Sequence, residues 1–122
     1  MTSSTTSILQ NNLGSIEWVA PVAAQKLHEA GNAKLILDVR TSQEWHKLHI
    51  EGALHIPLDD LPSSVDLLME HSNSTIVIHC RTDVRSQQAA KYLAQFGFDN
   101  LLVMQGGVTQ WERDRLPLVL GG

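Results

Sequence analysis

The chain contains very little cysteine: among its 122 residues there is one, Cys80. A single cysteine excludes an internal disulfide, a CxxC redox pair and a cysteine-cluster metal site. A chain without internal disulfides suits a reducing compartment. Cys80 is therefore a free thiol, and its neighbours in the sequence decide whether it is a small buried apolar side chain or a nucleophile.

The sequence also lacks an excess of positive charge and any long apolar run. It has 9 Lys and Arg against 13 Asp and Glu, and this net charge of −4 does not favour nucleic acid or acidic membranes as partners. No stretch approaches the roughly 18 consecutive apolar residues of a membrane span. Residues 1–14 lack the basic residue and the apolar run of a secretory signal, so we expect a flexible tail there. We predict a cytoplasmic protein with a single domain over residues 15–120.

Apolar runs of strand length alternate with helical patterns along this domain. Residues 34–39 and 74–79 form nearly continuous apolar runs, which are typical of strands covered on both faces in parallel sheets. Shorter strands are expected at residues 16–19, 52–57 and 101–104. Helices are expected after Ala20-Pro21, after Thr41 (carrying Trp45 and Leu48), from about Ser63, over residues 86–96 and after Gly106-Gly107. This alternation predicts an α/β fold, with a parallel sheet and helices on both of its faces.

The strongest candidate site surrounds Cys80, which follows the apolar run 74–79. Sites in parallel α/β sheets form at the carboxyl ends of strands. The polar loop after Cys80 leads into a helix that we expect to begin near Ser86, so loop N–H groups and the helix dipole would point at the sulfur. Arg81 and Arg85 add positive charge. Both effects favour the thiolate, which is the nucleophilic form of cysteine, and an anionic ligand beside it.

Five segments resemble, in order and spacing, the motifs of the rhodanese-like sulfurtransferases. They are residues 37–45 (LDVRTSQEW), 49–53 (HIEGA), 55–57 (HIP), 78–86 (IHCRTDVRS) and 106–111 (GGVTQW). The resemblance extends over nearly the whole chain, from about Ile16 to Leu118. It implies a five-stranded parallel sheet flanked by helices on both faces.

The resemblance also implies sulfur transfer through a persulfide on Cys80. The thiolate would attack the outer sulfur of a small anionic donor such as thiosulfate, sulfite would leave, and the sulfur would pass to a thiol or a protein acceptor. The donor could equally be a protein persulfide. The loop after the cysteine would bind the anion and the persulfide, through Arg81, Thr82, Asp83, Val84, Arg85 and Ser86. Asp38 and Arg40 would support these loops, with a catalytic base as the alternative role of Asp38, and no cofactor is implied.

Asp83 departs from the family pattern, in which many active members have glycine at this position. Glycine adopts a positive φ without steric cost, and aspartate is among the residues that tolerate the left-handed region. We therefore expect the loop to form. We also expect the Asp83 carboxylate to pair with Arg81 or Arg85, which would disfavour the thiolate and lower the efficiency with thiosulfate.

The histidines of the chain suggest structural roles. His46, His49 and His55 match no standard metal-ligand spacing, so we expect no metal site. His79 precedes Cys80, but neighbours on a strand face opposite ways, so His79 is expected to be a core residue.

Charged and aromatic side chains near the second strand are also expected to be structural. Thr41 and Glu44 form a capping-box pattern, and Arg40 and Glu44 are expected to pair. All three tryptophans are expected in the core, with one of them nearest the pocket rim: Trp18, Trp111 and, at the rim, Trp45.

Two other function classes remain open at this point. Cysteine phosphatases and arsenate reductases use Cys-x5-Arg, whose loop encircles a tetrahedral phosphate. Arg85 stands five residues after Cys80, so the loop is one residue short and we predict no meaningful phosphatase activity. The second class is a non-catalytic binding or regulatory module of the same fold, although such domains usually lack the cysteine that this chain has.

Overall fold

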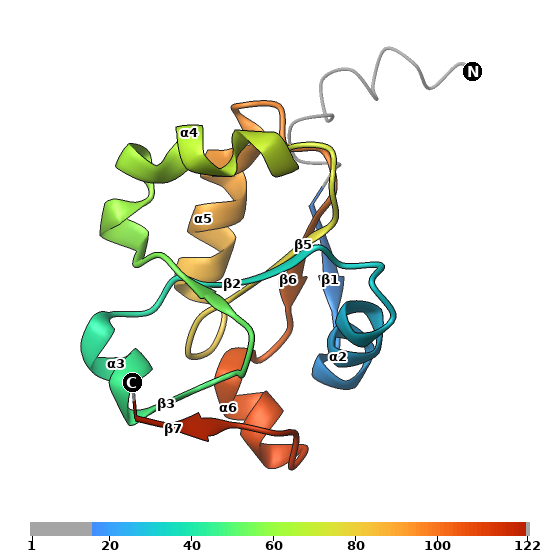
Figure 1. Ribbon diagram of the computed structural model, residues 1–122, viewed down its shortest axis with the longest axis vertical. Coiled ribbons are helices and arrows are strands. Elements are labelled where there is room, and N and C mark those ends of the chain that lie inside the picture. Colours follow the sequence, from blue (N-terminus) through green and yellow to red (C-terminus); the bar gives the residue numbers. More distant parts are fainter. Residues whose placement is uncertain (1–15, 122) are drawn as a thin grey trace.

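A parallel sheet of five strands, in the order β1-β6-β5-β2-β4, organises the fold (Figure 1). The computed structural model describes residues 16–121, so the tail predicted over residues 1–14 lies outside the described residues. The strands of this sheet are β1 (Ile16–Val19), β2 (Leu35–Asp38), β4 (Leu54–His55), β5 (Ile76–His79) and β6 (Leu101–Met104). All four pairings are parallel, which confirms the predicted α/β class.

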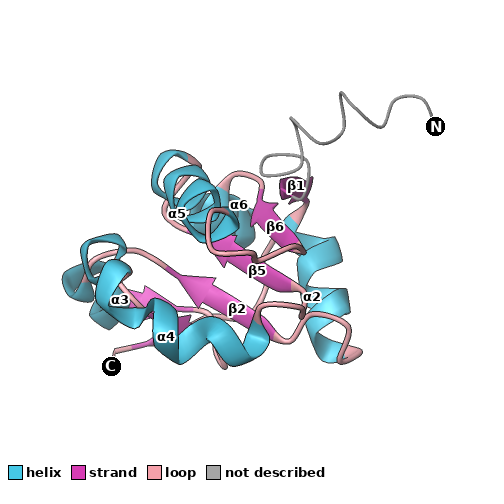
Figure 2. Cartoon of the chain, turned by 90° about the horizontal axis from the view of Figure 1, so that it is seen from above, coloured by secondary structure: helices cyan, strands magenta, loops and turns pink. Residues whose placement is uncertain are grey.

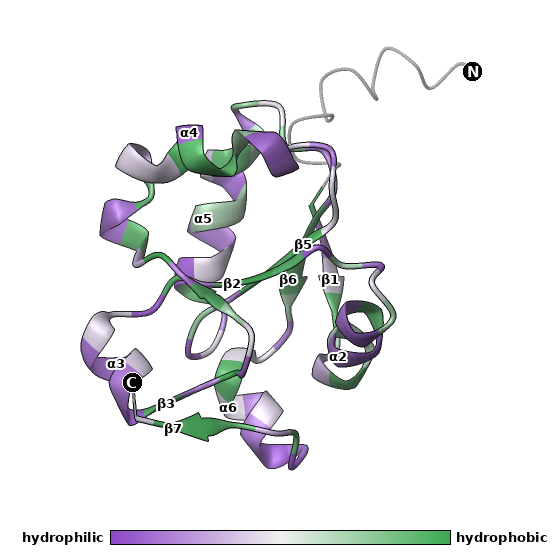
Figure 3. Cartoon of the chain, viewed as in Figure 1, coloured by the Kyte–Doolittle hydropathy of each residue, from purple (hydrophilic) through white to green (hydrophobic). Residues whose placement is uncertain are grey.

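The two predicted apolar runs form the centre of the sheet. All four residues of β5 are buried, and β2 pairs with β5 from Leu35 opposite Ile76 to Asp38 opposite His79. Figure 3 shows these strands in the colours of hydrophobic residues, beneath helices of mixed character. A strand that is apolar on both faces requires a cover on both faces, and the helices provide it.

Helices cover both faces of the sheet, as Figure 2 shows from above. They are α2 (Pro21–Glu29), α3 (Ser42–Lys47), α4 (Val65–Leu68), α5 (Val84–Ala94) and α6 (Gly107–Arg113). On one face, Ile76 and Ile78 pack in one core cluster with Leu93 of α5. On the other face, Val77 shares a second cluster with Trp111 of α6. The alternation along β5 therefore divides the core into two layers.

The helix predicted from about Ser63 is mostly a series of 3-10 turns. Only α4 is α-helical, between the 3-10 segments η1 (Leu58–Asp60), η2 (Pro62–Ser64) and η3 (Met69–His71). The hydroxyls of Ser63 and Ser64 both donate to the carbonyl of Asp60, at 3.0 Å. Serine side chains that bond the backbone locally compete with α-helix formation, which accounts for the difference.

A second, two-stranded sheet was not expected from the sequence. β3 (Leu48–His49) pairs antiparallel with β7 (Val119–Leu120). Leu48, predicted on the preceding helix, ends α3 in an extended conformation and begins β3. Strands of two residues are too short to show a periodicity. None of the helices within residues 16–121 combines the length and apolar character needed to cross a membrane.

Candidate active site

Cys80 lies directly after β5, at the carboxyl edge of the sheet. Asp38 and Met104 end β2 and β6 at this same edge. Cys80 is 1% exposed and is joined to α5 by residues 81–83 alone, because α5 begins at Val84. The helix thus begins two residues earlier than predicted. Its first turn reaches back over the cysteine.

The Cys80 sulfur is held by Ser86, in the first turn of α5. The backbone N–H of Ser86 donates to Sγ at 3.3 Å, and the thiol donates to Ser86 Oγ at 3.5 Å. Ser86 Oγ in turn donates to the carbonyl of Asp83 at 2.9 Å. An N–H at the positive end of a helix dipole stabilises negative charge on the sulfur. Ser86 is fully buried, so this bond is shielded from water.

Asp83 occupies its position without left-handed backbone geometry. Its φ is −142°, so this loop does not need the positive φ that glycine would allow. Its carboxylate accepts the backbone N–H of Gly106 at 2.8 Å. The expected pairing of Asp83 with Arg81 or Arg85 is therefore wrong: the carboxylate instead ties the cysteine loop to the start of α6.

The N-terminus of α6 packs directly against the cysteine loop. The N–H of Val108 donates to the Cys80 carbonyl at 2.9 Å, and the N–H of Thr109 donates to the Arg81 carbonyl at 3.1 Å. Gly107 has a φ of +58°, and a Cβ there would lie 2.4 Å from the Cys80 carbonyl oxygen. This approach of two backbones requires glycine.

Arg85 is bound to a carboxylate from another element. Its two terminal nitrogens donate to the two oxygens of Glu44 at 2.7 and 3.0 Å. Glu44 also forms the predicted capping box, because it accepts the N–H and hydroxyl of Thr41 at 2.9 and 3.0 Å. The bond from Arg85 is the main cause that lowers the pKa of Glu44 to about 2, and the same bond raises the pKa of Arg85.

Arg40 pairs with Asp38, not with Glu44 as expected. The Arg40 guanidinium donates to both Asp38 oxygens, at 2.8 to 3.1 Å, and also to the carbonyl of Leu48 at 2.8 Å. Both side chains are nearly inaccessible, at 3% and 0% exposure. Burial raises the pKa of Asp38, but the His79 ring in its protonated form, together with the hydrogen bonds and the charge of Arg40, outweighs it, so this pKa lies below its ordinary value. Asp38 thus lies in a closed, paired cluster.

His79 completes this buried cluster and is the core residue that the sequence predicts. It is 0% exposed, with Nδ1 3.3 Å from the Cys80 carbonyl and Nε2 3.6 Å from Asp38 Oδ2. Nε2 has no hydrogen-bond partner. Burial lowers the pKa of His79, so the imidazole is neutral at pH 7, and Arg40 is the permanent cation beside Asp38.

The three tryptophans have three different environments. Trp111 is a core residue at 2% exposure, but Trp18 is 49% exposed, since it lies on the edge strand β1. Trp45 is half-buried and stacks between His49 and His55, with ring centroids 3.7 and 4.7 Å away. Within residues 16–121, no three His, Cys, Asp or Glu side chains are grouped so that they would bind a metal ion.

A pocket of about 420 Å³ lies beside the cysteine loop. It is lined by Arg40, Glu44, Lys47, Leu48, Arg81, Val108, Thr109 and Glu112. Of the predicted loop residues, Arg81, Thr82 and Val84 are exposed. Neither Arg81 nor Lys47 belongs to an ion pair of the described chain. These two side chains are the unpaired cations of the pocket.

Two parts of the site were missed by sequence reasoning. Glu44 was identified as a helix cap, and no local pattern predicts its contact with Arg85, 41 residues further along the chain. The contacts of Gly106 and Gly107 with the cysteine loop were also missed. Two glycines where a strand gives way to a helix are a usable signal for such a close approach.

Comparison with known proteins places the sequence in a family. The family model of the rhodanese-like domain matches residues 20–114. A sulfurtransferase of Allochromatium vinosum is 35% identical over 85 residues, which are 70% of this chain and 78% of that protein. The probable adenylyltransferase/sulfurtransferase MoeZ of Mycobacterium tuberculosis is 33% identical over 89 residues. That alignment covers 73% of this chain and 23% of MoeZ, so the chain spans less than a quarter of that relative.

A solved structure extends the likeness over almost the whole chain. The thiosulfate sulfurtransferase of Pseudomonas aeruginosa superposes with a TM-score of 0.77 at 23% identity, over 98% of this chain and 23% of that one. At this identity the likeness concerns the fold. Because the family match extends from the start of α2 to the end of α6, the chain belongs to the rhodanese-like domain family.

Proposed function

We propose that this domain transfers sulfane sulfur and carries it on Cys80. The observation that supports this most directly is the bond from the Ser86 N–H to the Cys80 sulfur at 3.3 Å, at the N-terminus of α5. A thiolate or persulfide anion in this position gains a hydrogen bond and the positive end of the helix dipole. The sulfurtransferase of Allochromatium vinosum, of which the chain covers 78%, is one of its relatives.

The reaction has two steps that share one intermediate. In the first, the Cys80 thiolate attacks the outer sulfur of thiosulfate; an S–S bond forms on Cys80, and sulfite leaves with the electrons of the broken S–S bond. In the second, an acceptor thiolate attacks the outer persulfide sulfur, which gives an acceptor persulfide and restores the Cys80 thiolate. No external oxidant or reductant is needed. The covalent intermediate divides one transfer into two simpler ones.

The loop residues divide the remaining tasks. Ser86 stabilises the charge on sulfur, and the exposed Arg81 is the arginine available to attract an anionic donor. Asp83 and the buried Asp38–Arg40 pair hold the surrounding backbone in position. The exposed face of the loop suits a small sulfur donor or acceptor as well as a protein one. The cytoplasmic location stays a prediction.

The geometry of the loop does not support phosphatase activity. A phosphate-binding loop needs an arginine that clamps the phosphate. Arg85, the arginine nearest to that position in sequence, is already held at two points by Glu44. A non-catalytic module is disfavoured by the hydrogen bond from the Ser86 N–H to the Cys80 sulfur, which favours the thiolate.

The experiment that tests the proposal is a mass measurement on the intact protein. After incubation with thiosulfate, we expect the mass to increase by one sulfur, about 32 Da, and the increase to disappear on treatment with cyanide or dithiothreitol. The Cys80→Ser variant should gain no mass. If the wild-type protein gains no sulfur from thiosulfate, an alkyl thiosulfonate or polysulfide, the domain is a binding module instead.

A further inference from the structure

An ion pair between Arg85 and Glu44 lies at the start of α5, next to the cysteine loop. Arg85 lies in the first turn of α5, one residue before the serine that bonds the nucleophilic sulfur. Its two terminal nitrogens face both oxygens of Glu44, at 2.7 and 3.0 Å. Such two-point pairs between guanidinium and carboxylate are strong and geometrically specific. Arg85 is therefore largely withheld from any anion that approaches Cys80.

Glu44 is itself held firmly in this position. Thr41 donates its backbone N–H and its hydroxyl to the same carboxylate, at 2.9 and 3.0 Å. Both members of the pair are about 70% buried, with side-chain exposures of 30% for Arg85 and 28% for Glu44. A partly buried pair fixed on both sides does not open at low cost when an anion arrives.

The other charges around the loop leave a modest positive potential. Arg40 is neutralised by Asp38, at 2.8 Å. Arg81 and Lys47 are the unpaired cations of the neighbouring pocket, which also carries the carboxylates of Glu44 and Glu112. With Arg85 compensated by Glu44 and Arg40 by Asp38, a donor with two negative charges gains less attraction than the count of arginines suggests.

We propose that Glu44 is a specificity-determining residue, which disfavours small doubly charged donors such as thiosulfate and favours organic sulfane-sulfur donors with one negative charge. The inference rests on the sulfur-transfer function proposed above. The adjoining pocket supports it: its volume of about 420 Å³ lies in the range of roughly 300–1,000 Å³ that small organic ligands occupy, and Leu48 and Val108 add apolar surface.

The test compares two donors of different charge on a Glu44→Gln variant. Glutamine keeps the oxygen that accepts the Thr41 N–H, so the cap of α3 is retained, but it removes the charge that holds Arg85. We expect the KM for thiosulfate to fall about tenfold, which corresponds to about 1.4 kcal/mol of binding. The KM for methanethiosulfonate, a monoanion, should change less than about threefold, since a single charge gains less from the released arginine.

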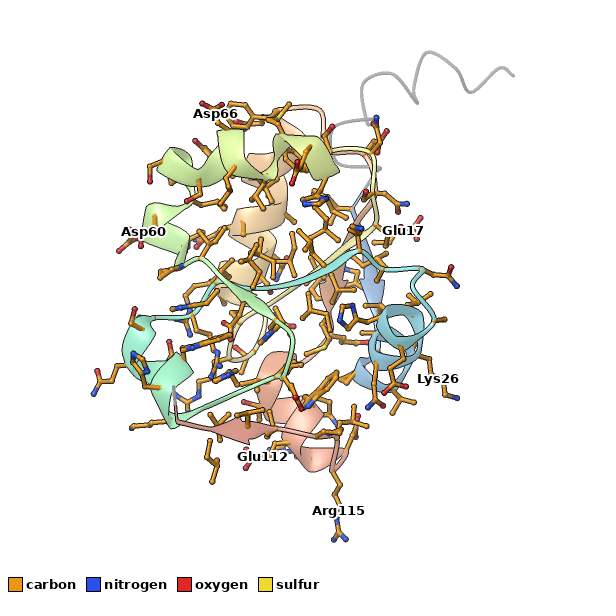
Figure 4. The ribbon with its side chains drawn as sticks, in the orientation of Figure 1. Glu17, Lys26, Asp60, Asp66, Glu112 and Arg115 are labelled. Carbon is orange, nitrogen blue, oxygen red and sulfur yellow. The ribbon has the colours of Figure 1, made fainter. Side chains whose placement is uncertain are left out.

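The matched control is Glu17→Gln, which makes the same change in net charge. Glu17 is exposed on β1, across the molecule from α3 (Figure 4). The Glu17→Gln substitution should leave the KM of both donors unchanged. Adding Arg85→Gln to Glu44→Gln should restore the wild-type KM for thiosulfate, because the fall in KM comes from the freed guanidinium. If Glu44→Gln changes the KM of both donors equally, or leaves both unchanged, Glu44 does not determine donor specificity.

Anion binding without turnover separates this inference from the proposed function. In the Cys80→Ser background, calorimetric titration with sulfate should give a several-fold tighter Kd when Glu44 is replaced by Gln. An unchanged Kd refutes the role of Glu44 even if sulfur transfer is found. Absence of sulfur transfer from thiosulfate, methanethiosulfonate and polysulfide in the wild-type protein refutes the proposed function, and the donor preference with it.

Discussion

At the scale of single residues, the contacts of Asp83 differ from those that the sequence suggests. Its φ of −142° is accessible to any residue, so its difference from glycine is not a matter of backbone strain. Its carboxylate bonds the Gly106 N–H at 2.8 Å and so links the cysteine loop to α6. The residue that the sequence marks as a possible weakness of the site is one of the contacts that hold it together.

This contact predicts how substitutions of Asp83 behave. Asp83→Ala or Asp83→Gly leaves the Gly106 N–H without a partner and should lower the free energy of unfolding by about 1–3 kcal/mol, with a loss of thiosulfate activity. Asp83→Asn keeps an acceptor oxygen and should stay within about 0.5 kcal/mol of the wild type. Denaturant unfolding and donor kinetics measure both effects. A more active Asp83→Gly protein of unchanged stability would contradict this account.

At the scale of elements, the site depends on how α6 meets the cysteine loop. Gly107→Ala would bring a Cβ to 2.4 Å from the Cys80 carbonyl oxygen, and backbone atoms cannot yield as side chains do. We expect a loss of more than about 3 kcal/mol in stability and at least a tenfold loss of persulfide formation.

Gly97→Ala separates this clash from the cost of a positive φ. Gly97 has a φ of +90° but no atom within 4 Å of its ideal Cβ position. Its replacement should cost about 1–2 kcal/mol, the usual penalty for left-handed backbone, and should leave persulfide formation intact. If the two alanine variants behave alike, the approach of α6 to the loop is not what requires glycine at position 107.

The elements also show what a sequence can predict. The strands β2, β5 and β6 were predictable, because their apolar runs are long enough to be recognised. The 3-10 turns after Leu58 were not, since serine hydroxyls bonded to Asp60 decide them. The same limit applies at the site: Cys80 and its helix follow from local sequence, whereas the partner of Arg85 lies 41 residues away and no local pattern identifies it.

At the scale of the whole molecule, the buried polar cluster behind Cys80 makes stability depend on pH. The native-state pKa of His79 lies below its ordinary 6.5, because burial disfavours the charged ring. Below pH 6.5 the unfolded chain therefore binds a proton that the native protein does not, so this contribution to stability is present above pH 6.5 and is lost as the pH falls. Asp38, whose native pKa lies below 3.8, contributes only in more acidic solution.

Unfolding by denaturant at pH 7.5 and pH 5.5 measures this contribution. We expect His79 to account for a loss approaching about 1.4 kcal/mol per pH unit below pH 6.5. His79→Gln should remove that part of the slope, and His46→Gln, at an exposed position, should leave it unchanged. A slope that His79→Gln does not alter would show that the ring gains a proton freely in the native protein.

The order of the strands also affects the way in which the chain acquires its structure. Ile16 in β1 pairs with Leu101 in β6, so the first described strand has no partner in the sheet until nearly the whole domain has been synthesised. Contacts between residues so distant in sequence are slow to form, because a long loop must close first. Until then β1 presents unpaired backbone groups and the exposed Trp18, which makes the nascent chain open to association with other chains. The docking of β1 is thus expected to be one of the last steps in the folding of the domain.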